Sequence, residues 1–247
     1  MEKKLLRFIN LAVGYDFPLI ENINLQAQSG EIIGLIGRNG AGKSTFLKTL
    51  SGIIPVHKGR VECQGVNIFE VPAFLRAQKI TIVLSGKINS GIKVIDFLRM
   101  GRYVYQLHKF GESKQGQIMV DSVISDLQLG KLLQKNLNAL SDGEHQKVMI
   151  GRALVQDTPV LLLDEPTTHL DMENKALILN LLEYVAKKLN KIIILSTHEV
   201  NLVLPKVDRI WLVKAGKLSE VNKSMISEIF QSEHLRYDAT CKIFRLN

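Results

Sequence analysis

A glycine-rich loop that ends in lysine is the first feature of this sequence that could do chemistry. Residues 37–44 read Gly-Arg-Asn-Gly-Ala-Gly-Lys-Ser, the spacing G-x-x-x-x-G-K-S, and Thr45 follows. In such a loop the backbone N–H groups wrap phosphate oxygens, the lysine reaches the outer phosphates and the serine hydroxyl binds magnesium. We therefore predict a site for a nucleoside triphosphate. Its members are Gly37, Arg38, Asn39, Gly40, Ala41, Gly42, Lys43, Ser44 and Thr45, with Ser44 on Mg²⁺.

Two adjacent carboxylates form the second chemical feature. Asp164 and Glu165 follow the wholly apolar run 160–163, which indicates a strand buried on both faces. Carboxylates at the end of such a strand are costly unless a cation or hydrogen-bond donors meet them. Beside a phosphate-binding loop, the simplest interpretation is that Asp164 holds Mg²⁺ and Glu165 polarises the attacking water. An acidic helix cap is the alternative.

Two further side chains are candidates because of where they stand along the chain. His198 follows the apolar run 191–195, and ligands of open α/β sheets bind at the carboxyl ends of the strands, so we place it in the site. Tyr15 lies in the turn Val-Gly-Tyr-Asp at 13–16. Its ring could cover the edge of the core or stack on a nucleotide base, and the residues alone leave both open.

The segment Leu-Ser-Asp-Gly-Glu at 140–144 precedes a helical pattern. Ser141 and Glu144 have the S-x-x-E spacing of a capping box, which predicts a well-capped helix start. A helix N-terminus with a glycine in its first turn is also suited to an anion. The two interpretations are compatible.

The elements that must position these residues follow from the hydrophobic pattern. Apolar runs at 31–36, 79–84, 160–163 and 191–195 predict parallel strands, and residues 45–50 and 172–189 predict helices. Short strands at 5–9 and 22–26 indicate a β-rich start, and a hairpin is expected over 208–221. From about residue 93 to residue 133 helical periodicity replaces the β pattern, which indicates a helical insertion. The tail is expected to add a helix and a strand at 242–246.

Composition narrows the class of protein further. The 247 residues suffice for one large domain, and the net charge is +8. Residues 76–115 hold eight Lys or Arg against two acidic residues, which suits either a solvated face or an anionic partner. The two cysteines lack metal spacing, and no window approaches the roughly 18 apolar residues of a membrane span. We expect a protein of the cytoplasm, or one held at a membrane by other chains.

Taken in order, these motifs resemble the ATP-binding subunits of ABC transporters over essentially the whole chain. Residues 37–44 are similar to the Walker A loop and 160–165 to the Walker B strand with its catalytic glutamate. Residues 168–171 are similar to the D-loop, His198 to the switch histidine and 140–144 to the signature motif. Within the superfamily the stretches 100–103 and 165–171 resemble subunits that power import of iron–siderophores, haem and vitamin B12.

The resemblance implies a P-loop NTPase fold of the α/β class, with a RecA-like core and mixed sheet, an antiparallel β lead-in and an inserted α-helical subdomain. It implies one ABC ATPase domain over 1–247, with the nucleotide-binding core at 1–86 and 156–247. The helical subdomain at 87–155 would include the signature motif. Tyr15 would stack on adenine, Glu165 would orient the hydrolytic water, and His198 would contact the γ-phosphate of ATP.

The resemblance also implies partners. Two copies would dimerise head to tail around two ATP molecules, with Ser141 and Gly143 completing the partner's site. Membrane-spanning permease subunits would bind the ATPase at the cytoplasmic face of the inner membrane, and a substrate-binding protein would act indirectly. An ABC-type ATPase acting on nucleic acid or ribosomes is the alternative, but the chain has neither heptads nor a second P-loop. A P-loop kinase is disfavoured by residues 140–144 and 168–171.

The chain departs from its apparent family at two positions. The usual signature is L-S-G-G-Q, whereas Asp142 replaces the first glycine and Glu144 the glutamine. A carboxylate near phosphate is repulsive unless it points away. Ser85 stands where the family has the Q-loop glutamine, and its shorter side chain would need a bridging water to reach magnesium.

Overall fold

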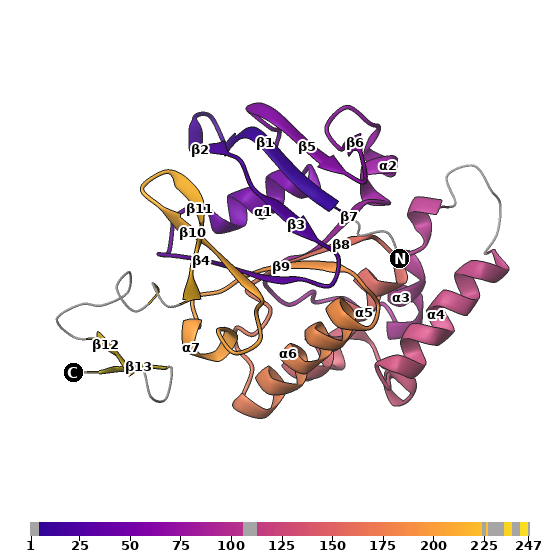
Figure 1. Cartoon of the computed structure of the whole chain (residues 1–247). Coiled ribbons are helices and arrows are strands. Elements are labelled where there is room, and N and C mark those ends of the chain that lie inside the picture. The colour runs from indigo at the N-terminus through magenta and orange to yellow at the C-terminus, as the bar shows by residue number, and fades with distance from the viewer. Residues whose placement is uncertain (1–4, 106–112, 224–225, 227–234, 239–242, 247) are drawn as a thin grey trace.

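The computed structural model describes residues 5–105, 113–223, 226, 235–238 and 243–246 (Figure 1). Its strands form an antiparallel sheet, a mainly parallel sheet and a separate two-stranded pair. Helices lie on both faces of the parallel sheet. The mixed α/β class and the antiparallel lead-in that the sequence predicts are confirmed.

The antiparallel sheet is built around its first strand, which pairs with three others. The prediction of one strand over 22–26 is wrong. The backbone of Asn22 is left-handed (φ 55°), and the Asn24 side chain accepts a hydrogen bond from the Asn10 N–H at 3.0 Å, so the chain turns here. The strands are β1 (Leu5–Gly14), β2 (Pro18–Ile23), β3 (Gln26–Gln28), β5 (Lys58–Cys63) and β6 (Val66–Asn67).

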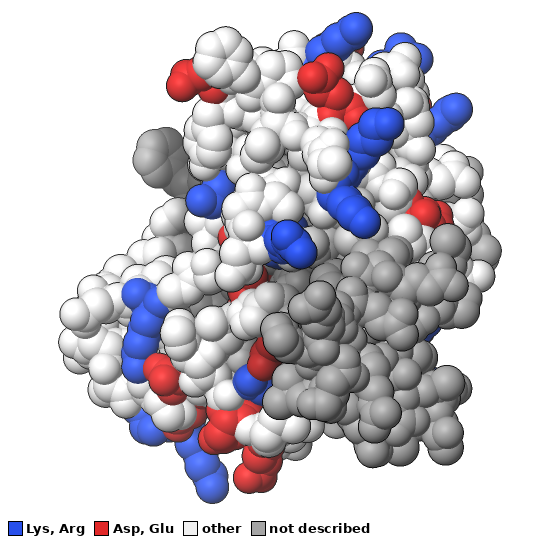
Figure 2. Space-filling view, turned by 90° about the vertical axis from the view of Figure 1, so that its left-hand side faces the viewer, with Lys and Arg blue, Asp and Glu red and all other residues white. Residues whose placement is uncertain are grey.

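The two-stranded pair closes the chain. The predicted strand at 242–246 is confirmed as β13 (Ile243–Leu246), which pairs antiparallel with β12 (Leu235–Asp238). The predicted tail helix falls largely outside the described residues. Figure 2 shows the side of the molecule that lies to the left in Figure 1. On the described part of this face, Lys and Arg lie interspersed with Asp and Glu rather than in one patch of a single sign.

The parallel sheet positions the candidate site. Its order is β11-β10-β4-β9-β8-β7, and only β11 runs antiparallel to its neighbour. Successive residues of β4, β8 and β9 face opposite sides, and both sides are buried, which explains why these strands read as continuous apolar runs. The strands are β4 (Ile32–Gly37), β7 (Ile80–Val83), β8 (Val160–Asp164), β9 (Ile192–Ser196), β10 (Arg209–Lys214) and β11 (Lys217–Val221).

Helix α1 (Lys43–Ser51) packs in the core between the two large sheets. Its Phe46 joins Phe8 of β1 and Trp211 of β10 in an aromatic cluster. The Phe8 and Trp211 rings meet edge to face with centroids 5.5 Å apart. These large buried rings fix the helix, and therefore the loop before it, against the sheet.

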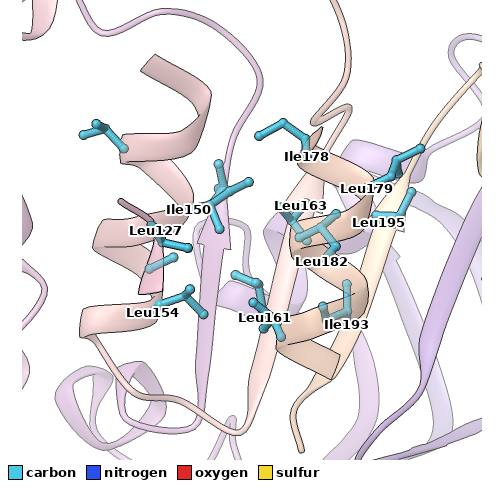
Figure 3. Packing of buried hydrophobic residues seen from close by; sticks show 14 of the residues in the cluster. Leu127, Ile150, Leu154, Leu161, Leu163, Ile178, Leu179, Leu182, Ile193 and Leu195 are labelled. Carbon is cyan, nitrogen blue, oxygen red and sulfur yellow. The ribbon is translucent and has the colours of Figure 1, made fainter. Parts of the chain in front are cut away.

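The opposite face of the parallel sheet is covered by α6 (Met172–Lys187). Figure 3 shows Ile178, Leu179 and Leu182 of α6 packed on alternate residues of β8 and β9. Beyond them Ile150 and Leu154 continue the same core into the helical segment. Its helices are α3 (Val94–Met100), α4 (Lys114–Asp126) and α5 (Asp142–Val155), with 3₁₀ turns at Tyr103–Tyr105, Gly130–Leu132 and Leu137–Ala139. The short helices α2 (Ala73–Ala77) and α7 (Val200–Val203) lie outside this helical segment.

Candidate active site

The glycine-rich loop joins β4 to α1 at the carboxyl edge of the parallel sheet. Gly40 and Gly42 have φ values of 77° and 107°, a region that L side chains rarely adopt. A Cβ on Gly42 would also lie 2.8 Å from Leu19 Cδ2, so a side chain there would have to displace Leu19 as well as strain the backbone. The loop therefore delivers backbone N–H groups to the positive end of α1, where an anion is stabilised.

Lys43 is held across this loop. Only 6% of the residue is exposed, and its Nζ donates to the carbonyl oxygens of Gly37 at 2.9 Å and Arg38 at 3.2 Å. Burial lowers the pKa of Lys43, and the carboxylates of Glu165 and Asp164 oppose that effect. A desolvated ammonium that meets mainly carbonyl oxygens is well placed to bind a phosphate oxygen.

Asp164 ends β8 and is almost wholly buried. Its Oδ1 accepts hydrogen bonds from Ser44 Oγ at 2.9 Å and Ser196 Oγ at 2.6 Å. No cluster of three or more His, Cys, Asp or Glu suited to a metal occurs in the part of the chain that the structure describes. Mg²⁺ fits the set of one carboxylate and one hydroxyl, since it takes oxygen ligands and fills its shell with water and substrate phosphates.

Glu165 follows at once and its side chain meets the end of β9. Its Oε2 lies 2.5 Å from His198 Nδ1 and accepts a hydrogen bond from Thr168 Oγ1 at 3.0 Å. Its backbone is left-handed, at φ 53°, and is fixed because its N–H donates to Ser196 Oγ at 3.0 Å. This uncommon conformation for a residue with a side chain turns Glu165 away from the path of the strand.

These residues share one cavity of about 400 Å³ at the sheet edge. Glu165 and His198 line it together with the loop, so the structure brings together residues more than 150 positions apart. Asp164 reaches the same place through Ser44. The lining residues are Asn39, Gly40, Gly42, Lys43, Ser44, Thr45, Glu165 and His198.

Tyr15 stands apart from this lining. It lies in the turn between β1 and β2 with 62% of its surface exposed. Its carbonyl oxygen lies 2.7 Å from His57 Nε2, which ties the turn to the segment before β5. The exposure argues against a role in covering the core, and stacking on adenine stays a prediction.

The segment 140–144 is also outside the cavity. Ser141 caps α5: its Oγ accepts from the Glu144 N–H at 3.3 Å, and Glu144 Oε2 accepts from the Ser141 N–H at 2.9 Å. The predicted capping box is confirmed. Gly143 makes a close approach to α6, because a Cβ there would lie 2.3 Å from Asn174 Oδ1 unless that side chain moved.

A second cavity of about 300 Å³ lies beside α5; Glu165 lines both cavities, and Thr168, which donates to Glu165, lines the second. The loop after β7 borders it through Ser85, Gly86 and Lys87. His145 of α5 is buried there and its Nε2 accepts from the Ile88 N–H at 3.1 Å. Burial, reinforced by the charge of Lys87, lowers the pKa of His145.

Sequence reasoning passed over three contributors. Ser196 bonds to both Asp164 and Glu165, and Thr168 holds the Glu165 carboxylate. Their signal was available, since both are polar residues near the ends of buried strands. Lys87 contacts the segment 140–144 across 55 positions, and no local pattern predicts such a pair.

The fold and the site define a class of protein. A parallel strand that runs into a glycine-rich loop and a buried helix, with an acidic pair two strands away, is the architecture of P-loop nucleotide-binding enzymes. The model of the ABC transporter family matches residues 20–168, so the chain belongs to this family of ATP-binding proteins and is an ATPase.

Relatives cover most of the chain. It is 34% identical to an uncharacterized ABC transporter ATP-binding protein of Methanocaldococcus jannaschii, over 98% of this chain and 87% of the other. It is 30% identical to a probable siderophore transport system ATP-binding protein of Bacillus subtilis, over 96% and 84%. The iron(3+)-hydroxamate import ATP-binding protein of Bacillus subtilis is 34% identical, over 77% and 72%.

Solved structures of ABC transporter proteins share the fold of this chain. A metal-chelate type ABC transporter in an inward-facing conformation superposes with a TM-score of 0.80 at 25% identity, over 98% of this chain and 95% of the other. A subunit of an ABC transporter complex from Clostridium perfringens gives a TM-score of 0.80 at 26% identity, over 92% of each chain. The Clostridium perfringens subunit is part of a larger transporter complex, and an ATP-binding cassette of the same fold has been solved as a dimer bound to ADP and phosphate.

Proposed function

We propose that this chain is the ATP-hydrolysing subunit of an importer whose substrate is an iron–siderophore, haem or a cobalamin-type chelate. The observation that carries the proposal is the meeting of Lys43, Glu165 and His198 on one cavity of the family fold. The substrate class rests on relatives that are named for siderophore and iron-hydroxamate import.

Each residue has a chemical role that its surroundings support. Lys43 and the loop N–H groups bind the β- and γ-phosphates, because they are preorganised donors at a helix N-terminus. Ser44 and Asp164 would hold Mg²⁺, which neutralises phosphate charge when bound. Glu165 accepts the proton of the attacking water or orients that water. His198, which contacts Glu165 in the structure, would contact the γ-phosphate when ATP is bound.

We propose further that the site is completed by a second copy of the chain. Ser141 and Gly143 lie outside the cavity that holds Lys43. They stand at the start of α5, where Ser141 is exposed and Gly143 is buried, and a helix N-terminus is suited to phosphate. In a head-to-tail dimer each copy supplies this start to the other's ATP. The core at 1–86 and 156–247 and the helical part at 87–155 would then be the two sides of one composite site.

The protein would act at the cytoplasmic face of the inner membrane, bound to permease subunits. No helix in the described part of the chain is long and apolar enough to cross a bilayer. Two cations of the basic segment already have partners: Lys87 pairs with Asp142, and Arg102 donates to the Val155 carbonyl and lies over the Tyr105 ring. The segment is therefore less available to an anionic surface than its charge count suggests.

The experiment that tests the transport proposal uses the protein with its membrane partner. The permease that copurifies with this chain is placed in lipid vesicles, and ATP hydrolysis is followed as binding proteins loaded with an iron–siderophore, haem or cobalamin are added. We expect one class to stimulate hydrolysis. The alternative is an ATPase that acts on nucleic acid or ribosomes. It would be favoured if neither the permease nor any loaded binding protein changed the rate of ATP hydrolysis, and if the protein bound nucleic acid in a salt-dependent way.

A further inference from the structure

The residue Asp142 poses an electrostatic problem. It stands between Ser141 and Gly143, which we propose to contact the partner's ATP, and its side chain is 58% exposed. An uncompensated carboxylate at this place would repel a triphosphate. The structure shows that the carboxylate does have a partner.

Lys87, in the loop after β7, provides two bonds to the segment. Its Nζ lies 3.2 Å from Asp142 Oδ1 and donates to the carbonyl oxygen of Leu140 at 2.8 Å. One ammonium thus contacts the residues on both sides of Ser141. It fixes the path of the backbone at the helix cap and at the same time cancels the added negative charge.

A third bond fastens the same loop on the far side. The Ile88 N–H donates to Nε2 of the buried His145 in the second turn of α5. The loop after β7 is therefore bonded to the start of α5 at Leu140, Asp142 and His145. Because β7 lies beside β8, this connection runs from the strand that carries Asp164 to the helix start that carries Ser141 and Gly143.

We propose that Lys87 is a positioning residue for ATP hydrolysis: it presents Ser141 and Gly143 to the partner's ATP and neutralises Asp142 so that the triphosphate can approach. The proposal rests on the composite site proposed above. The role is electrostatic and geometric rather than stabilising, since both side chains are about half exposed and such pairs add little to folding stability.

The test is a double-mutant cycle on the full-length protein, read as ATP hydrolysis at varied ATP concentration. For Lys87→Met we expect kcat/KM for ATP to fall about tenfold, with a rise in KM, because the Asp142 carboxylate is left unpaired. Asp142→Asn should equal or exceed the unmodified protein. The double variant should recover to within about threefold of Asp142→Asn, because no charge remains to repel the phosphates. Lys87→Arg should retain most of the activity.

Two controls make the cycle decisive. Lys206→Met removes a lysine that also forms a partly exposed ion pair, with Glu183, away from both cavities, and should leave kcat/KM unchanged. Thermal unfolding should show equal stability for all variants, so that the KM effect is not a folding effect.

The proposal is overturned if Lys87→Met matches the unmodified protein, or if Lys87→Met lowers kcat/KM by the same factor with Asn at position 142 as with Asp. This failure is distinguishable from failure of the proposed function. If Glu165→Gln abolishes hydrolysis but the double-mutant cycle shows no coupling between Lys87 and Asp142, only the role of Lys87 is wrong. If hydrolysis survives Glu165→Gln, the proposed active site is wrong.

Discussion

The two halves of the proposed ATP site are built in different ways. The half that contains Lys43 and Asp164 is buried, lies at a sheet edge and has its hydrogen bonds in place within one chain. The half that contains Ser141 and Gly143 is a helix start near the surface, held by a capping box and by the loop after β7. We propose that the first half binds phosphate by itself, whereas the second half contacts ATP only when that ATP is bound to another copy of the chain.

The largest effect is expected where the buried half is broken. Lys43→Ala removes the desolvated ammonium that we propose to bind the phosphates, and we expect hydrolysis to fall by about 100-fold or more, with ATP binding lost as well. Nucleotide titration measures ATP binding, and steady-state kinetics measures hydrolysis. Lys48→Ala is the matched control on the same helix. Retained ATP affinity in Lys43→Ala would contradict the role of the buried half.

A smaller loss of hydrolysis is expected from the exposed half. In Gly143→Ala the new Cβ would meet Asn174 Oδ1 at 2.3 Å, so either the Asn174 side chain or the start of α5 must shift. We expect hydrolysis to fall on the order of tenfold to 100-fold while one chain binds ATP as before.

The double variant Gly143→Ala/Asn174→Ala removes the atoms in conflict and should regain part of the activity. If ATP binding by the isolated chain falls as much as hydrolysis does, the two halves are not separate in the way proposed.

The cap of α5 offers a prediction about stability. Ser141→Ala removes the acceptor of the Glu144 N–H, and the free energy of unfolding should fall by about 1 kcal/mol. Ser141→Thr keeps the cap and is the control. Urea unfolding measures this loss, and hydrolysis measured beside it shows whether Ser141 also acts on ATP. A loss of hydrolysis in Ser141→Ala no greater than in Ser141→Thr would leave Ser141 a capping residue only.

The smallest effect concerns pH. His145 is buried and accepts a hydrogen bond, and burial lowers its pKa below the ordinary value of about 6.5. Below that pH the unfolded chain binds more protons than the folded one, so stability is fully present above about pH 6.5 and falls as the pH is lowered. Urea unfolding at pH 7.5 and 5.5 should show this loss, and His145→Gln should reduce it. An equal loss in the variant would assign the effect to other groups.

The difference between the halves also decides what sequence could predict. The loop 37–45, the acidic pair and the apolar strands have local patterns that physics ties to one structure. The capping box was equally local. The environment of Asp142 was not, because Lys87 reaches it only through the tertiary path from β7 to α5. The strand expected over 22–26 failed for a local reason that pattern counting misses, since asparagines there turn the chain.

The central claim is that ATP is bound by one copy and enclosed by the other. Glu165→Gln should bind ATP without hydrolysing it, so the enclosed state should accumulate. Light scattering on this variant with saturating ATP and Mg²⁺ measures its molecular mass and so tests the claim directly. We predict the mass of two chains with ATP and of one chain without it, and a variant that binds ATP yet stays at the mass of one chain would contradict the account.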